Sequence, residues 1–88
     1  MKLYRRINAN IEAVQYEPDR GITEFAEFVN KFCAEMSLSI QDDSVKAVIK
    51  LVDNSWVHVH PGAWLLRLED GRVCVCDDTY FRTEFETA

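Results

Sequence analysis

The stretch that most constrains the fold is residues 56–76, WVHVHPGAWLLRLEDGRVCVC, because it holds three strand-like runs separated by two turn signals. The pair Asp70-Gly71 lies between two apolar alternations, which is typical of a two-residue type I′ hairpin turn. That turn sets Leu68 opposite Val73, and side chains then alternate between the two faces of the hairpin. The predicted core face carries Trp64, Leu66, Leu68, Val73 and Val75, and the opposite face carries Leu65, Arg67, Cys74 and Cys76.

A second hairpin is predicted upstream, where residues 45–52 alternate between apolar and polar side chains. A three-residue loop at 53–55 pairs Leu51 with Val57 and brings the apolar residues of both strands onto one face. A two-residue loop would set apolar residues opposite polar ones, so we expect the longer loop. Three side chains then point away from the apolar face: Trp56, His58 and His60.

The N-terminal part of the chain predicts one strand followed by one helix. The strand covers residues 3–16 and is broken by the proline, aspartate and glycine within residues 18–21. The period then becomes helical, with Thr23 as the expected N-cap. Apolar residues recur three and four apart at Ile22, Phe25, Ala26, Val29, Phe32, Cys33 and Met36. This stripe predicts an amphipathic helix packed on the sheet, with Cys33 as a buried structural thiol.

Turn-forming residues mark the boundaries of the remaining segments of the chain. Pro61-Gly62 predicts a turn into the next strand. Residues 38–44 form a connector without a clear period, in which Asp42-Asp43 predicts a turn. Near the C-terminus, Asp77 or Asp78 is expected to cap a short helical turn. Phe85 is expected to anchor the tail.

Together these elements predict an α+β fold with one domain spanning residues 1–88. We expect an antiparallel sheet of four to six strands, mostly a meander, with one main helix on one face. A chain of 88 residues can bury one modest core but not two.

Charge and cysteine usage limit the functional classes. A formal net charge of −5 argues against a nucleic-acid-binding protein, because phosphate contacts require clustered basic residues. Six acids lie within residues 69–88, which favours basic partners at that end. Three cysteines, two of them only two residues apart, indicate a reducing compartment. Neither a signal-peptide core nor an apolar run of about 18 residues is present, so we expect a cytosolic protein without membrane contact.

Short motifs along the chain resemble a family of small tailed-phage proteins of unsettled function. The first motif is residues 12–16, Glu-Ala-Val-Gln-Tyr, which follow a basic run. The second is residues 61–66, Pro-Gly-Ala-Trp-Leu-Leu, where Ala63 replaces the aspartate of the family. The third combines Cys76, Phe81 and the pair Phe85-Glu86. The resemblance implies a phage-encoded protein acting in the cytoplasm of a bacterial host, and it brings no residue-level function.

No catalytic pattern emerges from the residues, and we expect neither an enzyme nor a cofactor. The sharpest alternative is a zinc site, because two imidazoles and two thiolates are a suitable ligand set. Its ligands are His58, His60, Cys74 and Cys76, paired at two-residue spacing on strands. The sequence instead favours two solvent-facing histidines and two small residues beneath the C-terminal tail. The three glycines lie far apart and form no phosphate-binding loop.

The remaining hypothesis is a protein-binding module that acts in host takeover or counter-defence. The alternatives are a phage structural or assembly protein and a small-ligand or nucleotide binder. Tryptophan and tyrosine are favoured interface anchors. The candidate binding residues are Trp56, His58, His60 and Tyr80, although a second layer covering Trp56 remains open. The partner is expected to be a host or phage protein, or a second copy in a homodimer paired along residues 46–52 or 57–60.

Overall fold

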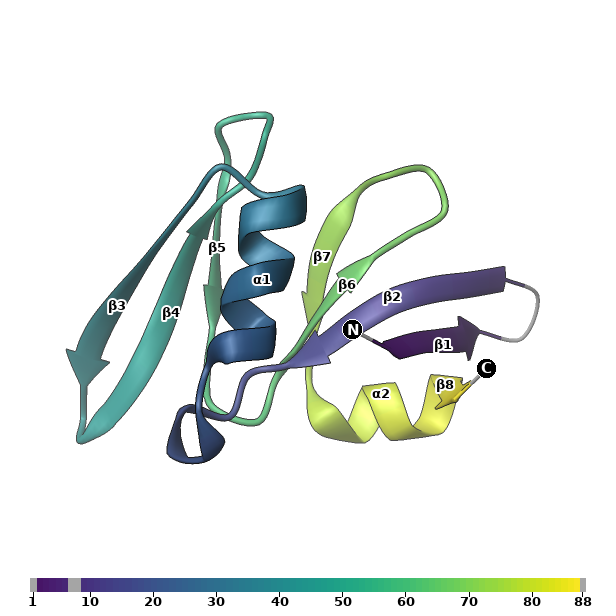
Figure 1. Cartoon of the computed structure of the whole chain (residues 1–88). Coiled ribbons are helices and arrows are strands. Elements are labelled where there is room, and N and C mark those ends of the chain that lie inside the picture. The colour runs from purple at the N-terminus through teal and green to yellow at the C-terminus, as the bar shows by residue number, and fades with distance from the viewer. Residues whose placement is uncertain (1, 7–8, 88) are drawn as a thin grey trace.

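The computed structural model describes residues 2–6 and 9–87, and within them the side chains of residues 11–40 and 42–85. The fold is α+β, as predicted, with two antiparallel sheets and two helices (Figure 1). The strands are β1 (Lys2–Arg6), β2 (Ala9–Gln15), β3 (Glu35–Gln41), β4 (Ser44–Lys50), β5 (Trp56–Val59), β6 (Trp64–Arg67), β7 (Val73–Cys76) and β8 (Phe85–Thr87). The helices are α1 (Thr23–Phe32) and α2 (Asp78–Glu84), and Pro18–Arg20 forms a 3₁₀ turn.

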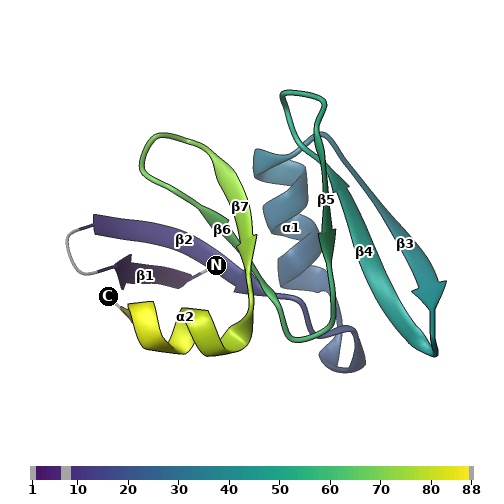
Figure 2. The same ribbon diagram turned by 180° about the vertical axis from the view of Figure 1, so that it is seen from behind.

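The two sheets differ in size and in origin along the chain. The larger has the order β7-β6-β2-β1-β8, so it combines the two ends of the sequence. The smaller, β3-β4-β5, is a meander of consecutive strands. Helix α1 lies between the sheets, and α2 lies under the larger sheet at the other end of the molecule (Figures 1 and 2).

The main core forms where α1 packs between the sheets. Phe25, Phe28 and Val29 of α1 are each at most 3% exposed. They pack with Val14, Tyr16, Ala47, Ile49, Val59 and Leu65 from both sheets. The Tyr16 hydroxyl donates a hydrogen bond to the Val45 carbonyl at 2.8 Å. The larger sheet is thereby joined to the smaller one by both apolar packing and a hydrogen bond.

A second core lies on the opposite face of the larger sheet, against α2. Its members are Ile11, Ala13, Trp64, Leu66, Phe81 and Phe85. The Trp64 and Phe81 rings stack at 3.7 Å, and Phe81 continues the stack onto Phe85 at 5.0 Å. Phe85 anchors the tail as predicted, with 8% of its surface exposed.

The predictions of a single meander with one helix and of a single core were therefore wrong. The run Trp64-Leu65-Leu66 is buried at three consecutive positions, so β6 carries apolar side chains on both faces. A strand of this kind needs cover on both sides. Here α1 covers one face and α2 the other, and β6 pairs with β2 as well as with β7.

The hairpin at Asp70-Gly71 exists, but its register differs by one residue from the prediction. Leu66 lies opposite Cys74 rather than Val75, because the loop has three residues and closes with a bond from the Leu68 N–H to the Arg72 carbonyl. Only Gly71 has positive φ, whereas a type I′ turn needs positive φ at both central positions. The one-residue shift exchanges the faces of β7. Cys74 and Cys76 therefore share the face of Trp64, Leu66 and Leu68, while Val73 and Val75 face α1 with Leu65.

The β4–β5 loop has three residues as expected, but it lies one position earlier, at 52–54. Val57 pairs with Ile49 instead of Leu51, and the Leu51 N–H bonds to the Ser55 carbonyl. Asn54 supplies the positive φ of 71° that the loop requires. The pairing shifts by an even number of residues, so the apolar residues stay on one face.

Three strands were missed at the sequence level: β3, β8 and one strand of the β1–β2 hairpin. The expected connector at 38–44 belongs largely to β3, which pairs with β4 along its whole length. Asp42-Asp43 forms the predicted turn with positive φ at both residues, the conformation of a type I′ hairpin. The first strand is in fact the β1–β2 hairpin, whose residues 7 and 8 lie outside the described residues. Because β4 is the central strand of its sheet, residues 46–52 are not an edge, contrary to the prediction.

The remaining local predictions hold with small changes. Pro61-Gly62 forms the turn that takes the chain from the smaller sheet into the larger one, with Gly62 at φ 91°. Asp77 caps α2 by accepting a bond from the Tyr80 N–H at 2.7 Å. Helix α1 begins at Thr23 after Ile22, so Thr23 is not its N-cap, and it ends before Met36, which lies in β3.

The core of α1 generates the first test. We expect Phe28→Ala to lower the free energy of unfolding by about 3–5 kcal/mol, because the ring is fully buried and its loss leaves a cavity. Urea denaturation followed by fluorescence measures the change. Asn30→Ala, on the exposed side of the same helix, should alter stability by no more than about 0.5 kcal/mol. Equal effects of the two substitutions would show that α1 does not pack between the sheets.

Candidate functional site: a groove beside strand β7 and helix α2

Two adjoining hollows lie along β7 and share Val75, Cys76 and Asp77 in their walls. The first has a volume of about 490 Å³ and lies between β6, β7 and the aromatic residues of α2 and β8. The second has a volume of about 400 Å³ and extends toward β5 and the turn at Pro61-Gly62. We call the two hollows together the β7 groove.

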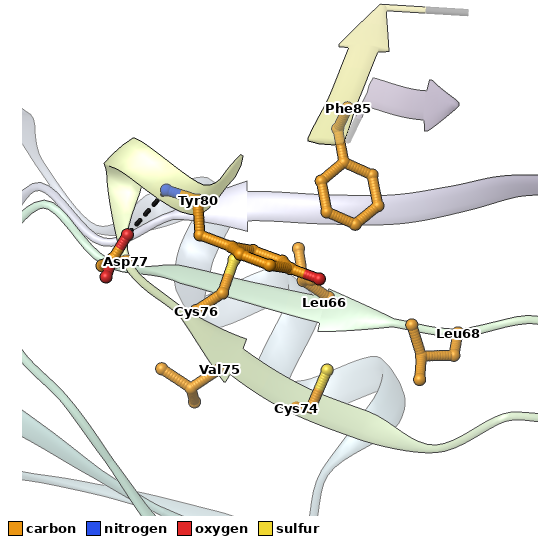
Figure 3. A pocket seen from close by; sticks show the side chains of 8 residues that line it. All are labelled: Leu66, Leu68, Cys74, Val75, Cys76, Asp77, Tyr80 and Phe85. Carbon is orange, nitrogen blue, oxygen red and sulfur yellow. Dashed lines mark hydrogen bonds between the residues drawn. The ribbon is translucent and has the colours of Figure 1, made fainter. Parts of the chain in front are cut away.

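The first hollow is mostly apolar. Leu66 and Leu68 line it from β6 and the residue that follows, and Cys74 and Cys76 line it from β7 (Figure 3). Tyr80 lies over Cys76 and makes an edge-on contact with the Phe85 ring, with ring centroids 6.4 Å apart. The two thiols face this hollow because of the one-residue hairpin register described above.

The second hollow is lined by imidazole and carboxylate side chains as well as by apolar surface. His58 and His60 reach it from β5, and Asp77 and Asp78 reach it from the start of α2. Both histidines are exposed to solvent. The groove therefore joins an apolar end to an end that carries imidazoles and carboxylates.

The Cys76 thiol is protonated at neutral pH. Its pKa is raised from 9.0 to about 11, first by burial and then by the nearby charges of Cys74, Asp77 and Asp78. Burial also raises the pKa of the Cys33 thiol. A nucleophilic or metal-binding cysteine requires the thiolate form. The groove therefore holds Cys76 as a neutral, weakly polar surface rather than as a reactive group.

The predicted zinc ligands are divided between the two hollows. Cys74 lines the first hollow only, whereas His58 and His60 line the second. Within residues 11–40 and 42–85, no group of three or more His, Cys, Asp or Glu side chains could hold a metal ion. The arrangement accordingly offers binding contacts rather than a coordination site.

Three of the four predicted binding residues line the groove, but in different hollows. His58 and His60 line the second hollow, whereas Tyr80 lines the first and is 43% exposed. Trp56 lies further along β5, outside both hollows. It is 50% exposed, so no second layer covers it, and the Lys50 ammonium lies 5.9 Å from its ring centroid. This cation–π contact holds the indole on the surface of the smaller sheet.

Asp78, predicted only as a possible cap of the C-terminal helix, makes a set of contacts that the sequence did not predict. Its Oδ1 accepts hydrogen bonds from the Trp64 indole at 2.8 Å and from the Gln15 amide at 3.3 Å. Its Oδ2 accepts a bond from Arg82 at 2.8 Å. The Gln15 amide also donates to the Gly62 carbonyl at 3.0 Å. One carboxylate thus ties α2 to β2 and β6 beside the turn that closes the groove, a role that depends on contacts distant in the sequence.

Comparison of the chain with protein-family models, curated proteins and solved structures finds no match. None of the helices within the described residues is both long enough and apolar enough to cross a membrane.

The Asp78 network predicts a specific acid sensitivity. Hydrogen bonds from Trp64 and Arg82 hold the pKa of Asp78 below its usual value of 3.8. Because the unfolded chain binds the proton first, this contribution is complete above the ordinary pKa and is lost as the pH falls below it. We expect Asp78→Asn to be less stable than wild type at pH 6, with the difference shrinking below pH 3.8. Urea unfolding across this range provides the measurement, and parallel stability curves would contradict the role of the network.

The raised pKa of Cys76 predicts slow alkylation. At pH 8 the shift from 9.0 to about 11 reduces the thiolate fraction about a hundredfold. We expect iodoacetamide to modify Cys76 more slowly by about that factor in the folded protein than in urea. Fragmentation mass spectrometry distinguishes Cys76 from Cys74 in the same peptide. Equal rates in the folded and unfolded states would show that the groove does not shield the sulfur.

Proposed function

We propose that this protein is a non-catalytic protein-binding module of a bacteriophage that acts in the cytoplasm of its bacterial host. Its contact surface is the β7 groove together with the Trp56 side chain on β5. The partner is a host or phage protein. The sequence motifs at residues 12–16 and 61–66 support the phage origin, because they resemble those of small tailed-phage proteins.

The observation that carries the proposal is the juxtaposition of exposed aromatic and imidazole side chains with an open groove. Trp56 and Tyr80 are each about half exposed, although large aromatic rings gain most from burial. Rings of this kind act as anchors when a partner covers them. Trp56, His58 and His60 follow one another at two-residue spacing on β5 or just beyond it, so their side chains share one face.

The charge of the groove indicates the chemistry of the partner. Asp77 is exposed between the two hollows, and the whole chain carries a net charge of −5. An apolar side chain fits beneath Tyr80, and a basic side chain beside it meets the carboxylate end. The partner segment is therefore one in which an apolar residue is flanked by lysine or arginine.

The test begins with affinity capture from phage-infected host cells and continues with the purified partner. We expect Trp56→Ala and Tyr80→Ala each to weaken the measured Kd about tenfold or more, because anchor residues carry most of the binding energy. Isothermal titration calorimetry provides the Kd values. Thermal denaturation of each variant verifies that the fold is intact.

Val52→Ala is the matched control for this experiment. Val52 is 77% exposed and lies in the β4–β5 loop away from both hollows of the groove. Its substitution should leave the Kd unchanged. A partner that binds wild type, Trp56→Ala and Tyr80→Ala with the same Kd would refute the proposed surface.

A further inference from the structure

The outer edge of the smaller sheet is an unusually open strand. Strand β3 pairs with β4 on one side, and no strand of residues 2–6 or 9–87 pairs with its other side. It lies at the outermost edge of the molecule in both views (Figures 1 and 2), at the opposite end from α2. Its backbone N–H and C=O groups on that side are therefore accessible to another chain.

The side chains of β3 leave an apolar strip beyond the reach of α1. Leu38 is 49% exposed and Ile40 is 81% exposed, although both lie on the face of the buried residues Ala47 and Ile49. The strip continues the apolar face of the smaller sheet past the helix. Exposed isoleucine on a strand edge costs solubility unless another surface covers it.

Strand β3 also lacks the features that normally protect an edge. Its sequence, EMSLSIQ, contains no proline and no lysine, and between Glu35 and its last residue it carries no charge. All seven residues pair in regular register with β4, so no bulge interrupts the strand. Natural edge strands usually carry at least one of these protections against pairing.

We infer that β3 pairs with β3 of a second copy of this chain, forming a symmetric dimer with one continuous six-stranded sheet. The two strands run antiparallel about a two-fold axis at Leu38. In this register Leu38 faces Leu38, Ile40 faces Met36, and Ser37 faces Ser39 of the other copy. Apolar residues thus meet only apolar ones, and hydroxyls meet only hydroxyls. Such self-complementarity is what a two-fold interface requires, and the regular alternation of apolar and polar residues in β3 provides it.

Charge at the ends of the paired strands favours the same occupant. The register brings the Asp42-Asp43 turn of one copy beside residues 33 and 34 of the other. Those residues follow directly after α1, whose last turn carries Lys31, a cation that opposes the negative partial charge of the helix C-terminal end. Glu35 lies opposite position 41, which is a glutamine, so no like charges oppose each other there. The acidic turn of each copy lies beside the segment that follows Lys31 of the other copy.

This interface is distinct from the β7 groove, which stays open in the dimer because it lies along β7 and α2. It also differs from the homodimer predicted from the sequence, which pairs along residues 46–52 or 57–60. The dimer would present two copies of the groove, whatever partner the groove binds.

Sedimentation equilibrium over a wide concentration range tests the inference. We expect the average mass of wild type to rise from the 10.2 kDa of one chain toward twice that value. Leu38→Lys should stay monomeric at the same concentrations, because two lysines would face each other across the axis. Val52→Lys adds the same charge at an exposed apolar position in the β4–β5 loop and should dimerise like wild type.

A wild-type protein that is monomeric at every concentration overturns the inference. A dimer that persists in Leu38→Lys also overturns the inference. If that dimer is lost in Trp56→Ala, its interface lies on the Trp56 face instead. None of these results bears on binding of a partner to the groove, which Trp56→Ala and Tyr80→Ala test separately.

Disulfide formation tests the register itself. With oxidised glutathione as the oxidant, Leu38→Cys should form a covalent dimer, because the two thiols face each other across the axis. Ile40→Cys is the matched control, since position 40 is more exposed but faces residue 36 of the other copy. Non-reducing electrophoresis follows the reaction. Covalent dimer from Ile40→Cys at the rate of Leu38→Cys contradicts the two-fold axis at Leu38.

Discussion

The contact between Trp64 and α2 determines whether this protein has a groove at all. Helix α2 has only seven residues, too few to be stable alone in water. Its position depends on the Trp64 indole, which stacks on Phe81 and donates its N–H to Asp78. Tyr80 lies on the same helix, so the position of its ring in the wall of the first hollow depends on this contact. The same residues therefore build the second core and position the wall of the β7 groove.

The accessible chemistry of the groove depends on two of its side chains, Cys76 and Asp78. Burial keeps the Cys76 sulfur protonated, and the Asp78 carboxylate is already engaged by three donors. What remains accessible is apolar surface, aromatic edges, two exposed imidazoles and the Asp77 carboxylate. The protonated Cys76 thiol adds no charge to the first hollow, whose lining residues include the Asp77 carboxylate.

The elements that could be predicted from the sequence are those specified by local signals. The Asp42-Asp43 and Pro61-Gly62 turns, the Asp77 cap and the α1 stripe each depend on neighbours in the chain. The predicted register of the β6–β7 hairpin was wrong because Gly71 fits both a two-residue and a three-residue loop. The apolar pattern of β7 did not distinguish the two loop lengths. Both faces of β7 are covered, so valines and cysteines can occupy either side. Strand β3 alternates plainly in Met36, Leu38 and Ile40, but Met36 also extended the helical period. The role of Asp78 depends on Gln15 and Trp64, and no local pattern brings these together.

The pairing of β1 with β8 sets the order in which the two sheets can form during synthesis. Tyr4 lies opposite Thr87, so the outer part of the larger sheet joins residues from the two ends of the sequence. The smaller sheet uses only residues 35–59 and three strands in succession. On the ribosome it has all its strands long before residues 85–87 emerge, and its local contacts close faster than distant ones. The nascent chain therefore has a complete β3 edge while the larger sheet still lacks its C-terminal strands β6, β7 and β8.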